Sequence, residues 1–188
     1  MKYAAKVKFS PELRYMHKAT VVLTEHAKRK EEDDPALVRY YIPKRQEDMI
    51  RAALPKTLQT ANIAISRTTI DLTHFENDIK PHVHTVEKCV LNFYIKTNGE
   101  ETSFYEGALE TDDEAVIDNH NLYRMIKTDG LTKVESFKAS DNDAWILTTI
   151  QPHQVAASVE QDYIRDMIQV YFIDLPFNKV VKEFEVLV

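Results

Sequence analysis

The sequence CVLNFYIKTNGEETSFY, residues 89–105, decides the fold of this chain. Its first half alternates at period two: one face carries Cys89, Leu91, Phe93 and Ile95, and the other carries Val90, Asn92 and Tyr94. This period is typical of a β-strand, whose successive side chains point to opposite faces. The dipeptide Asn98-Gly99 then predicts a tight turn into a second strand over 102–105.

The strand pattern extends in both directions from this segment. Ile63 and Ile65, then Ile70 and Leu72, alternate at period two, but the parity changes between the pairs, which predicts a β-bulge near Arg67. Asp129-Gly130 predicts a second hairpin, between strands at 122–128 and 131–137. Further strands are predicted over 144–149, 155–159, 167–175 and 180–188. Many short strands without intervening helices favour a sandwich or a barrel.

Helices are predicted only in the N-terminal third of the chain. Ser10-Pro11 is a helix-start signal followed by apolar residues at helical spacing, so a helix is predicted over about 11–31. A shorter helix is predicted from Pro43 to Ala53. The 188 residues fit one domain, with about 1–58 as a helical cover and about 59–188 as the β core. The expected fold class is mainly β with N-terminal helices.

Composition excludes several classes of function. The formal net charge is -6 and no basic stretch is interleaved with aromatic residues, so no nucleic-acid partner is expected. Cys89 is the single cysteine, which excludes an intramolecular disulfide and a cysteine-rich zinc site and fits a reducing, cytoplasmic location. No run approaches the roughly 20 apolar residues that a membrane helix needs.

The segment Lys80-Pro81-His82-Val83-His84 carries the most informative chemistry. In an extended strand His82 and His84 point to the same side, so both imidazoles can reach one point in space. His153, in the context Gln151-Pro152-His153, is the best candidate for a third ligand. Neutral imidazole suits Fe, Zn, Ni, Cu or Mn. The alternative is a pair of partly exposed histidines at a strand edge and an unrelated Pro-His dipeptide.

Several segments together resemble the iron(II)- and 2-oxoglutarate-dependent oxygenases, most of all the aspartyl/asparaginyl- and prolyl-hydroxylase-like and phage-type members. The segments are Pro81-His82-Val83-His84, Cys89 to Ile95, Thr102 to Glu106, Asp143-Ala144-Trp145 to Pro152-His153, and Arg165. The resemblance implies Fe(II) at the histidines and an Arg165 that grips the distal carboxylate of 2-oxoglutarate. Two departures stand out: His84 replaces the carboxylate ligand of the family, and Met167 replaces a frequent serine.

The same segments also resemble the cupins, whose first motif is His-x-His followed by a glutamate. Here the spacing from His84 to Glu87 is one residue shorter than in that motif. The segment Gln151-Pro152-His153 lacks the glycine of the second cupin motif. In this interpretation Glu87 is a possible fourth ligand; the alternative is a solvent-facing partner of Lys88. Both resemblances imply a double-stranded β-helix, the cupin-like jelly roll.

The side chains that can line a pocket are few. Asn92, Tyr94 and Tyr105 are candidates for binding a cofactor, whereas core packing is favoured for Trp145. Arg165 opens an apolar strand, so it either reaches inward to an anion or caps a sheet edge in solvent.

Three functions therefore stay open at the level of sequence. The first is a 2-oxoglutarate-dependent hydroxylase with Fe(II), or another divalent metal such as Zn or Ni, acting on a small molecule or a peptide. The second is a cupin-type dioxygenase or isomerase that does not use 2-oxoglutarate. The third is a non-catalytic binding protein on the same fold. The apolar segment at 180–187 also predicts a strand whose edge can pair in a homodimer.

Overall fold

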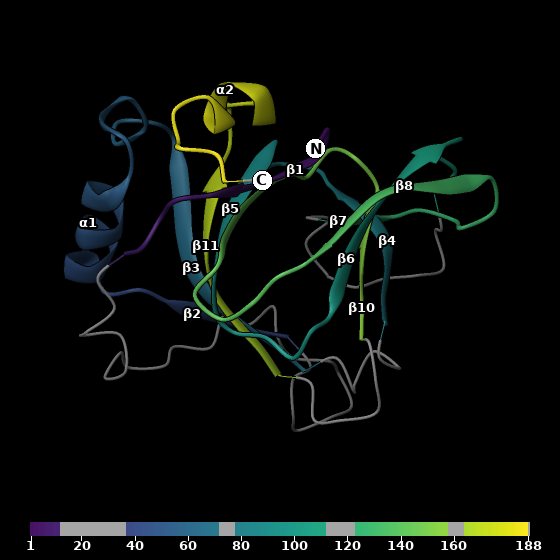
Figure 1. The fold of residues 1–188 in the computed structure, drawn as a ribbon, viewed down its shortest axis with the longest axis horizontal. Coiled ribbons are helices and arrows are strands. Elements are labelled where there is room, and N and C mark those ends of the chain that lie inside the picture. Colours follow the sequence, from purple (N-terminus) through teal and green to yellow (C-terminus); the bar gives the residue numbers. More distant parts are fainter. Residues whose placement is uncertain (12–36, 72–77, 112–122, 158–163, 188) are drawn as a thin grey trace.

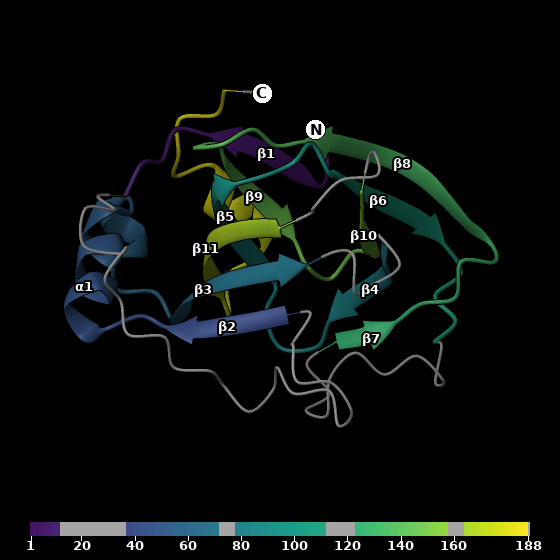
Figure 2. The same cartoon turned by 90° about the horizontal axis from the view of Figure 1, so that it is seen from below.

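The structure is a computed structural model that describes residues 1–11, 37–71, 78–111, 123–157 and 164–187. Its strands form two antiparallel sheets that face each other (Figure 1), and Figure 2 shows the strand order in both. The first sheet has the order β1 (Ala4–Val7), β9 (Ala144–Thr148), β5 (Cys89–Lys96), β11 (Ile164–Phe172), β3 (Ile63–Asp71) and β2 (Leu37–Tyr41). The second has the order β7 (Tyr123–Met125), β4 (Asp78–His84), β10 (His153–Ala156), β6 (Glu101–Gly107) and β8 (Leu131–Lys138).

The chain passes between the two sheets again and again. From β3 to β6, and again from β8 to β11, each strand lies in the opposite sheet from the one before it. Two four-stranded sheets connected in this way form a jelly roll. The predicted double-stranded β-helix is confirmed, with β1 and β2 added to the edges of the first sheet and β7 to an edge of the second.

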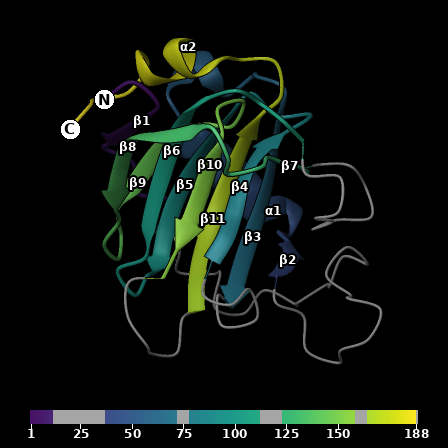
Figure 3. The same ribbon diagram turned by 90° about the vertical axis from the view of Figure 1, so that its right-hand side faces the viewer.

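The first sheet is buried on both faces because its central strands separate two hydrophobic cores. Odd-numbered residues of β5, such as Leu91 and Phe93, pack in the outer core, together with Ile50 of α1 (Lys44–Ala53) and Val180 of α2 (Phe177–Val181). A short 3-10 helix, Lys56–Leu58, extends this cover. Even-numbered residues of β5 face the second sheet, which lies in front of the first in Figure 3, and they contribute to the inner core between the two sheets. The site described below opens from this inner space.

The predicted bulge near Arg67 is wrong. β3 pairs with β11 in one unbroken register from Ile63 to Asp71. The parity of the apolar residues changes because the two halves of β3 face different cores: Ile63 and Ile65 pack on the outer one, and Ile70 on the inner one.

The two predicted turns exist, but neither makes a hairpin. Gly99 and Gly130 have positive φ values of 79° and 81°, as tight turns require. However, β5 and β6 lie in different sheets, and β7 and β8 lie at opposite edges of the second sheet. A turn is determined by a few neighbouring residues. In a jelly roll, however, each strand next to such a turn pairs with a strand from a distant part of the chain.

The ends of the chain also differ from expectation. Instead of a strand over 180–188, the structure has α2, and only Val186 forms an isolated bridge, to Val7. Burial of Val180 in the outer core favours this short helix, and the proposed dimer edge loses its basis. The helix predicted from Pro43 to Ala53 is confirmed by α1, whereas the one over about 11–31 falls almost entirely outside the described residues. Residues 1–58 are not only a helical cover, since they contribute β1 and β2.

No helix in the described part of the chain is both long and apolar enough to cross a membrane.

Candidate metal centre

Two neighbouring strands of the second sheet bring the three predicted histidines together. In the pairing of β4 with β10, His82 lies directly opposite His153, and directly opposed side chains on one face are neighbours. His84 follows two residues later on β4, so it shares that face. The ligand atoms of the three side chains all lie within 4.8 Å of one another. The jelly-roll register, and not the sequence spacing of His153, creates the cluster.

Hydrogen bonds from backbone carbonyls fix the orientation of two of the rings. Nδ1 of His82 lies 2.9 Å from the carbonyl oxygen of Lys80, and Nδ1 of His153 lies 2.9 Å from that of Gln151. A carbonyl only accepts, so Nδ1 carries the proton and donates in both cases. The other nitrogen, Nε2, is then unprotonated and has the lone pair that a metal ion needs.

His84 is oriented in the same way, but by a carboxylate. Its Nδ1 lies 3.3 Å from Oε2 of Glu87. The backbone of this segment is anchored to Thr149, whose hydroxyl donates to the Glu87 carbonyl at 2.5 Å and whose carbonyl accepts from the His84 amide at 2.8 Å. Glu87 is buried, so the solvent-facing role beside Lys88 is wrong. It lies outside the cluster of ligand atoms and contacts a ligand instead.

The surroundings of His82 and His153 favour their neutral form. Burial lowers the pKa of His82. Burial also lowers the pKa of His153 well below its usual value, and the neighbouring His82 and His84 lower it further. A neutral imidazole is the form that binds a metal. Ligand atoms about 2.1 Å from one ion lie at most about 4.2 Å apart, which is close to the 4.8 Å within which these ligand atoms lie. The donor set therefore fits a divalent transition metal.

The histidines lie in a pocket of about 70 Å³ between the two sheets. Tyr123 packs edge-on against His84, with ring centroids 4.7 Å apart, and against His82 at 5.5 Å. Apart from these rings the pocket wall is mostly aliphatic: Ile70, Ile79, Val90, Leu147, Val155 and Met167 line it. A pocket of this size and character suits a small, largely apolar molecule.

A row of polar side chains from β5 and β11 forms another part of the pocket. The hydroxyl of Tyr171 donates to Gln169 at 2.5 Å, and the amide of Gln169 donates to the side-chain carbonyl of Asn92 at 3.1 Å. Asn92 in turn lies 3.4 Å from the hydroxyl of Tyr94, to which its amide donates. Gln169 and Asn92 line the pocket, and their carbonyls are engaged within the row. Each of these two amide groups uses one N–H and one carbonyl lone pair within the row, so each keeps one N–H and one lone pair for a ligand.

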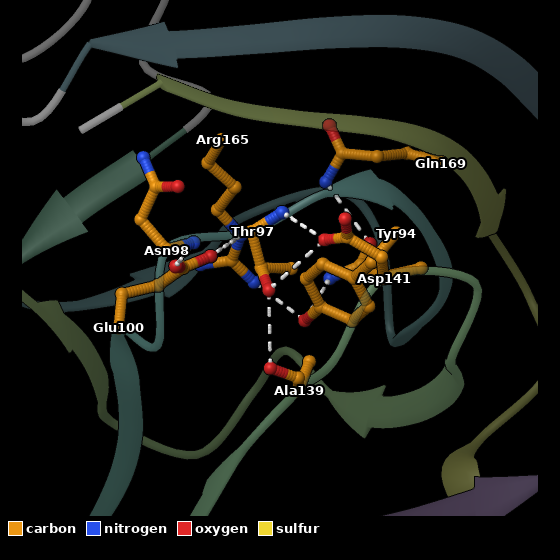
Figure 4. Close-up of polar contacts among 9 residues, drawn as sticks. Tyr94, Thr97, Asn98, Glu100, Ala139, Asp141, Arg165 and Gln169 are labelled. Carbon is orange, nitrogen blue, oxygen red and sulfur yellow. Dashed lines mark hydrogen bonds and ion pairs between the residues drawn. The ribbon is translucent and has the colours of Figure 1, made fainter. Parts of the chain in front are cut away.

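Arg165 points into the pocket and not to solvent. Its side chain is 3% exposed and its Nη2 donates to the Tyr94 hydroxyl at 2.5 Å. Its Nε lies 3.3 Å from Oε1 of Glu100, which is equally buried (Figure 4). The contact is close enough to be an ion pair but does not have the geometry of a hydrogen bond, and neither atom has a hydrogen-bond partner among the described residues. Of the two sequence-based alternatives for Arg165, the structure supports the inward one.

Not every predicted residue reaches the pocket. Tyr94 lies behind the wall, beneath Arg165. The Tyr105 hydroxyl donates to Gln154, whose neighbours on β10 both line the pocket, so Tyr105 lies on the opposite face of the sheet. Trp145 stacks on Phe137 with centroids 3.9 Å apart, in agreement with the predicted core role.

Three residues of the site were not predicted from sequence. Gln169 shares the period-two face of β11 with Arg165, so parity could have indicated it. Glu100 and Tyr123 had no comparable signal, because one follows a turn and the other lies on a three-residue edge strand.

No protein-family model matches the sequence, and no curated protein resembles it in sequence. Solved structures with some similarity include the oxalate decarboxylase of Lactobacillus farciminis in complex with formate, at 12% identity and a TM-score of 0.38, over 87% of this chain and 35% of that one. Another is the vicilin of hazelnut, Corylus avellana, at 11% identity and a TM-score of 0.40, over 84% of this chain and 31% of that one. The chain spans about a third of the length of either protein.

Proposed function

We propose that this protein is a metal-dependent oxidoreductase of the dioxygenase type, with Fe(II) held by His82, His84 and His153, acting on a small molecule without 2-oxoglutarate. One observation carries the proposal: three imidazoles converge in a pocket with their Nδ1 atoms already engaged, so their Nε2 atoms are left to bind an ion. A structural role for the histidines does not require this convergence.

The three candidate ligands all belong to one of the two sheets. All three histidines come from β4 and β10 of the second sheet, so they would hold an ion from that sheet alone. A divalent iron bound there supplies Lewis acidity and redox chemistry with oxygen. The three histidines line the pocket, so a small molecule bound there would lie next to an ion that they hold. The aliphatic wall keeps the substrate's body out of water, and Asn92 and Gln169 offer donors that orient its polar atoms.

The second candidate is a 2-oxoglutarate-dependent hydroxylase, and the placement of Arg165 favours it. An arginine inside the pocket is what the distal carboxylate of that cosubstrate requires. Two features weigh against it. Arg165 already has Glu100 as counter-ion, and His84 stands where that family supplies a carboxylate ligand. We therefore place this candidate second.

The metal content of untagged protein is the first test. We expect close to one transition-metal ion per chain after Fe(II) reconstitution under anaerobic conditions, and its loss in His153→Ala. Lys80→Ala is the matched control, because its side chain is exposed while its backbone carbonyl, which orients His82, is kept. Absence of stoichiometric metal, or unchanged content in His153→Ala, refutes the proposal. A visible charge-transfer band on anaerobic addition of Fe(II) and 2-oxoglutarate would favour the second candidate.

A further inference from the structure

Arg165 is a buried cation whose surroundings decide what kind of ligand the pocket accepts. Its guanidinium lies 4.7 Å from the centre of the Tyr94 ring and donates one hydrogen bond, to the hydroxyl of that residue. A buried guanidinium needs a counter-charge, because desolvation of an unpaired ion is costly. Its position on the pocket wall leaves two sources for that charge: the protein or a ligand.

The protein supplies the charge through Glu100. Oε1 of Glu100 faces Arg165 at 3.3 Å, and Oε2 accepts a hydrogen bond from the backbone amide of Asn98 at 2.9 Å (Figure 4). The turn that holds Glu100 is tied down: the backbone amide of Thr97 donates to Asp141 at 2.8 Å. Glu100 does not line the pocket, whereas Arg165 does. The carboxylate therefore neutralises the guanidinium from behind.

A ligand carboxylate at Arg165 would compete with this internal one. Binding it beside Glu100 places two buried negative charges on one positive charge, and moving Glu100 away breaks its contact with the Asn98 amide and leaves it buried and unpaired. An uncharged group meets neither cost and still has Arg165, Asn92 and Gln169 as donors.

We infer that Glu100 is a specificity-determining residue, which occupies the anion position of Arg165 so that the pocket selects ligands that are uncharged at the end facing Arg165. The inference rests on the proposed metal site and narrows its substrate class. Small molecules with a metal-chelating head and an uncharged tail fit this arrangement; dicarboxylates do not.

Two probes of equal chain length test the inference. 2-Oxoglutarate and 2-oxopentanoate share the same chelating 2-oxo acid head and differ in the terminal group, a carboxylate or a methyl. Binding of each to Co²⁺-loaded protein is measured anaerobically from the visible spectrum of the metal and by calorimetry. We expect wild-type protein to bind 2-oxopentanoate at least tenfold more tightly. Glu100→Gln keeps the shape of the side chain and removes its charge, so the preference should reverse in favour of 2-oxoglutarate.

Two further variants make the result specific. Glu101→Gln removes the neighbouring carboxylate, which pairs with Lys133 at the surface, and should keep the wild-type preference. The double variant Glu100→Gln/Arg165→Gln removes both buried charges and should also keep it, because no cation is left to attract the carboxylate.

Each outcome has a defined meaning. Tighter binding of 2-oxoglutarate by wild-type protein overturns the inference, and so does an unchanged preference in folded Glu100→Gln. If that variant does not fold, the comparison of wild-type protein with the double variant still tests the inference. Binding of 2-oxoglutarate at least tenfold more tightly by wild-type protein than by the double variant would show that Arg165 binds a ligand carboxylate although Glu100 is present, and this result refutes the inference. Failure of Co²⁺ to bind at all is a separate result, which removes the proposed metal site.

Discussion

Replacing Glu87 tests whether its carboxylate orients a metal ligand or is one. In Glu87→Gln the amide keeps the volume of the side chain but loses its charge, so the contact to Nδ1 of His84 becomes a neutral hydrogen bond. Loss of a partner that orients a metal ligand typically costs about 10- to 100-fold in metal affinity. The 3.3 Å separation exceeds the roughly 2.7–2.9 Å of strong charge-assisted bonds, so we expect the lower end, about tenfold or about 1.4 kcal/mol.

The assay is a competition titration of Co²⁺ or Zn²⁺ against a chromophoric chelator at constant pH. Glu185→Gln is the control, because that residue is exposed and pairs with Lys8 far from the site. An affinity within twofold of wild type would show that Glu87 does not act through His84. A loss beyond about a thousandfold would show that Glu87 coordinates the ion directly, and the account of it as an orienting residue would be wrong.

Three further predictions concern stability and reactivity. Cys89 is fully buried and burial raises the pKa of its thiol, so Ellman's reagent should leave folded protein unmodified and label it in denaturant; rapid labelling of native protein would contradict the packing of β5. Burial lowers the pKa values of His82 and His153 in the folded state, so below pH of about 6.5 the unfolded state takes up these protons before the folded state does. The free energy of unfolding of metal-free protein should fall on acidification by up to about 1.4 kcal/mol per pH unit for each histidine, and a flat profile between pH 7 and 5 would refute this. A Cβ on Gly107 would lie 2.1 Å from the carbonyl oxygen of Gly130, so Gly107→Ala should cost about 3 kcal/mol in urea unfolding, against about 1 kcal/mol for Gly130→Ala, where nothing lies within 4 Å.

Sequence periodicity predicted the strands well and their pairing poorly. The alternation in residues 89–95 correctly divided β5 between two cores, because side-chain direction along a strand follows from local geometry. The same local information could not show that the strands flanking Asp129-Gly130 lie at opposite sheet edges. Pairing in a jelly roll depends on contacts between distant segments, and no short pattern encodes them.

The part of the candidate metal centre that lies on a single strand could be predicted from the sequence. His82 and His84 follow from the alternation of a strand. His153 was chosen from its Pro-His context at the start of a predicted strand, and only the register of β4 and β10 places it opposite His82. Glu87 was misjudged because burial decides its role, and burial depends on the chain segment around Thr149. Glu100 was missed for a similar reason: its contact to Arg165 is made between a turn and a strand more than sixty residues away.

The placement of the two buried carboxylates gives the pocket a charge asymmetry. Among the described residues that line it, none is acidic; Glu87 lies behind His84 and Glu100 behind Arg165. A divalent ion held by neutral imidazoles keeps most of its positive charge, since a carboxylate that acts through an imidazole offsets less of it than one bound directly. With an ion bound, the histidine end of the pocket would attract an anionic chelating group, whereas Glu100 already neutralises the Arg165 end. A ligand that fits both ends of the pocket has a negative charge at the histidine end and none at the Arg165 end. The proposed substrates have this distribution of charge, whereas 2-oxoglutarate is negatively charged at both ends.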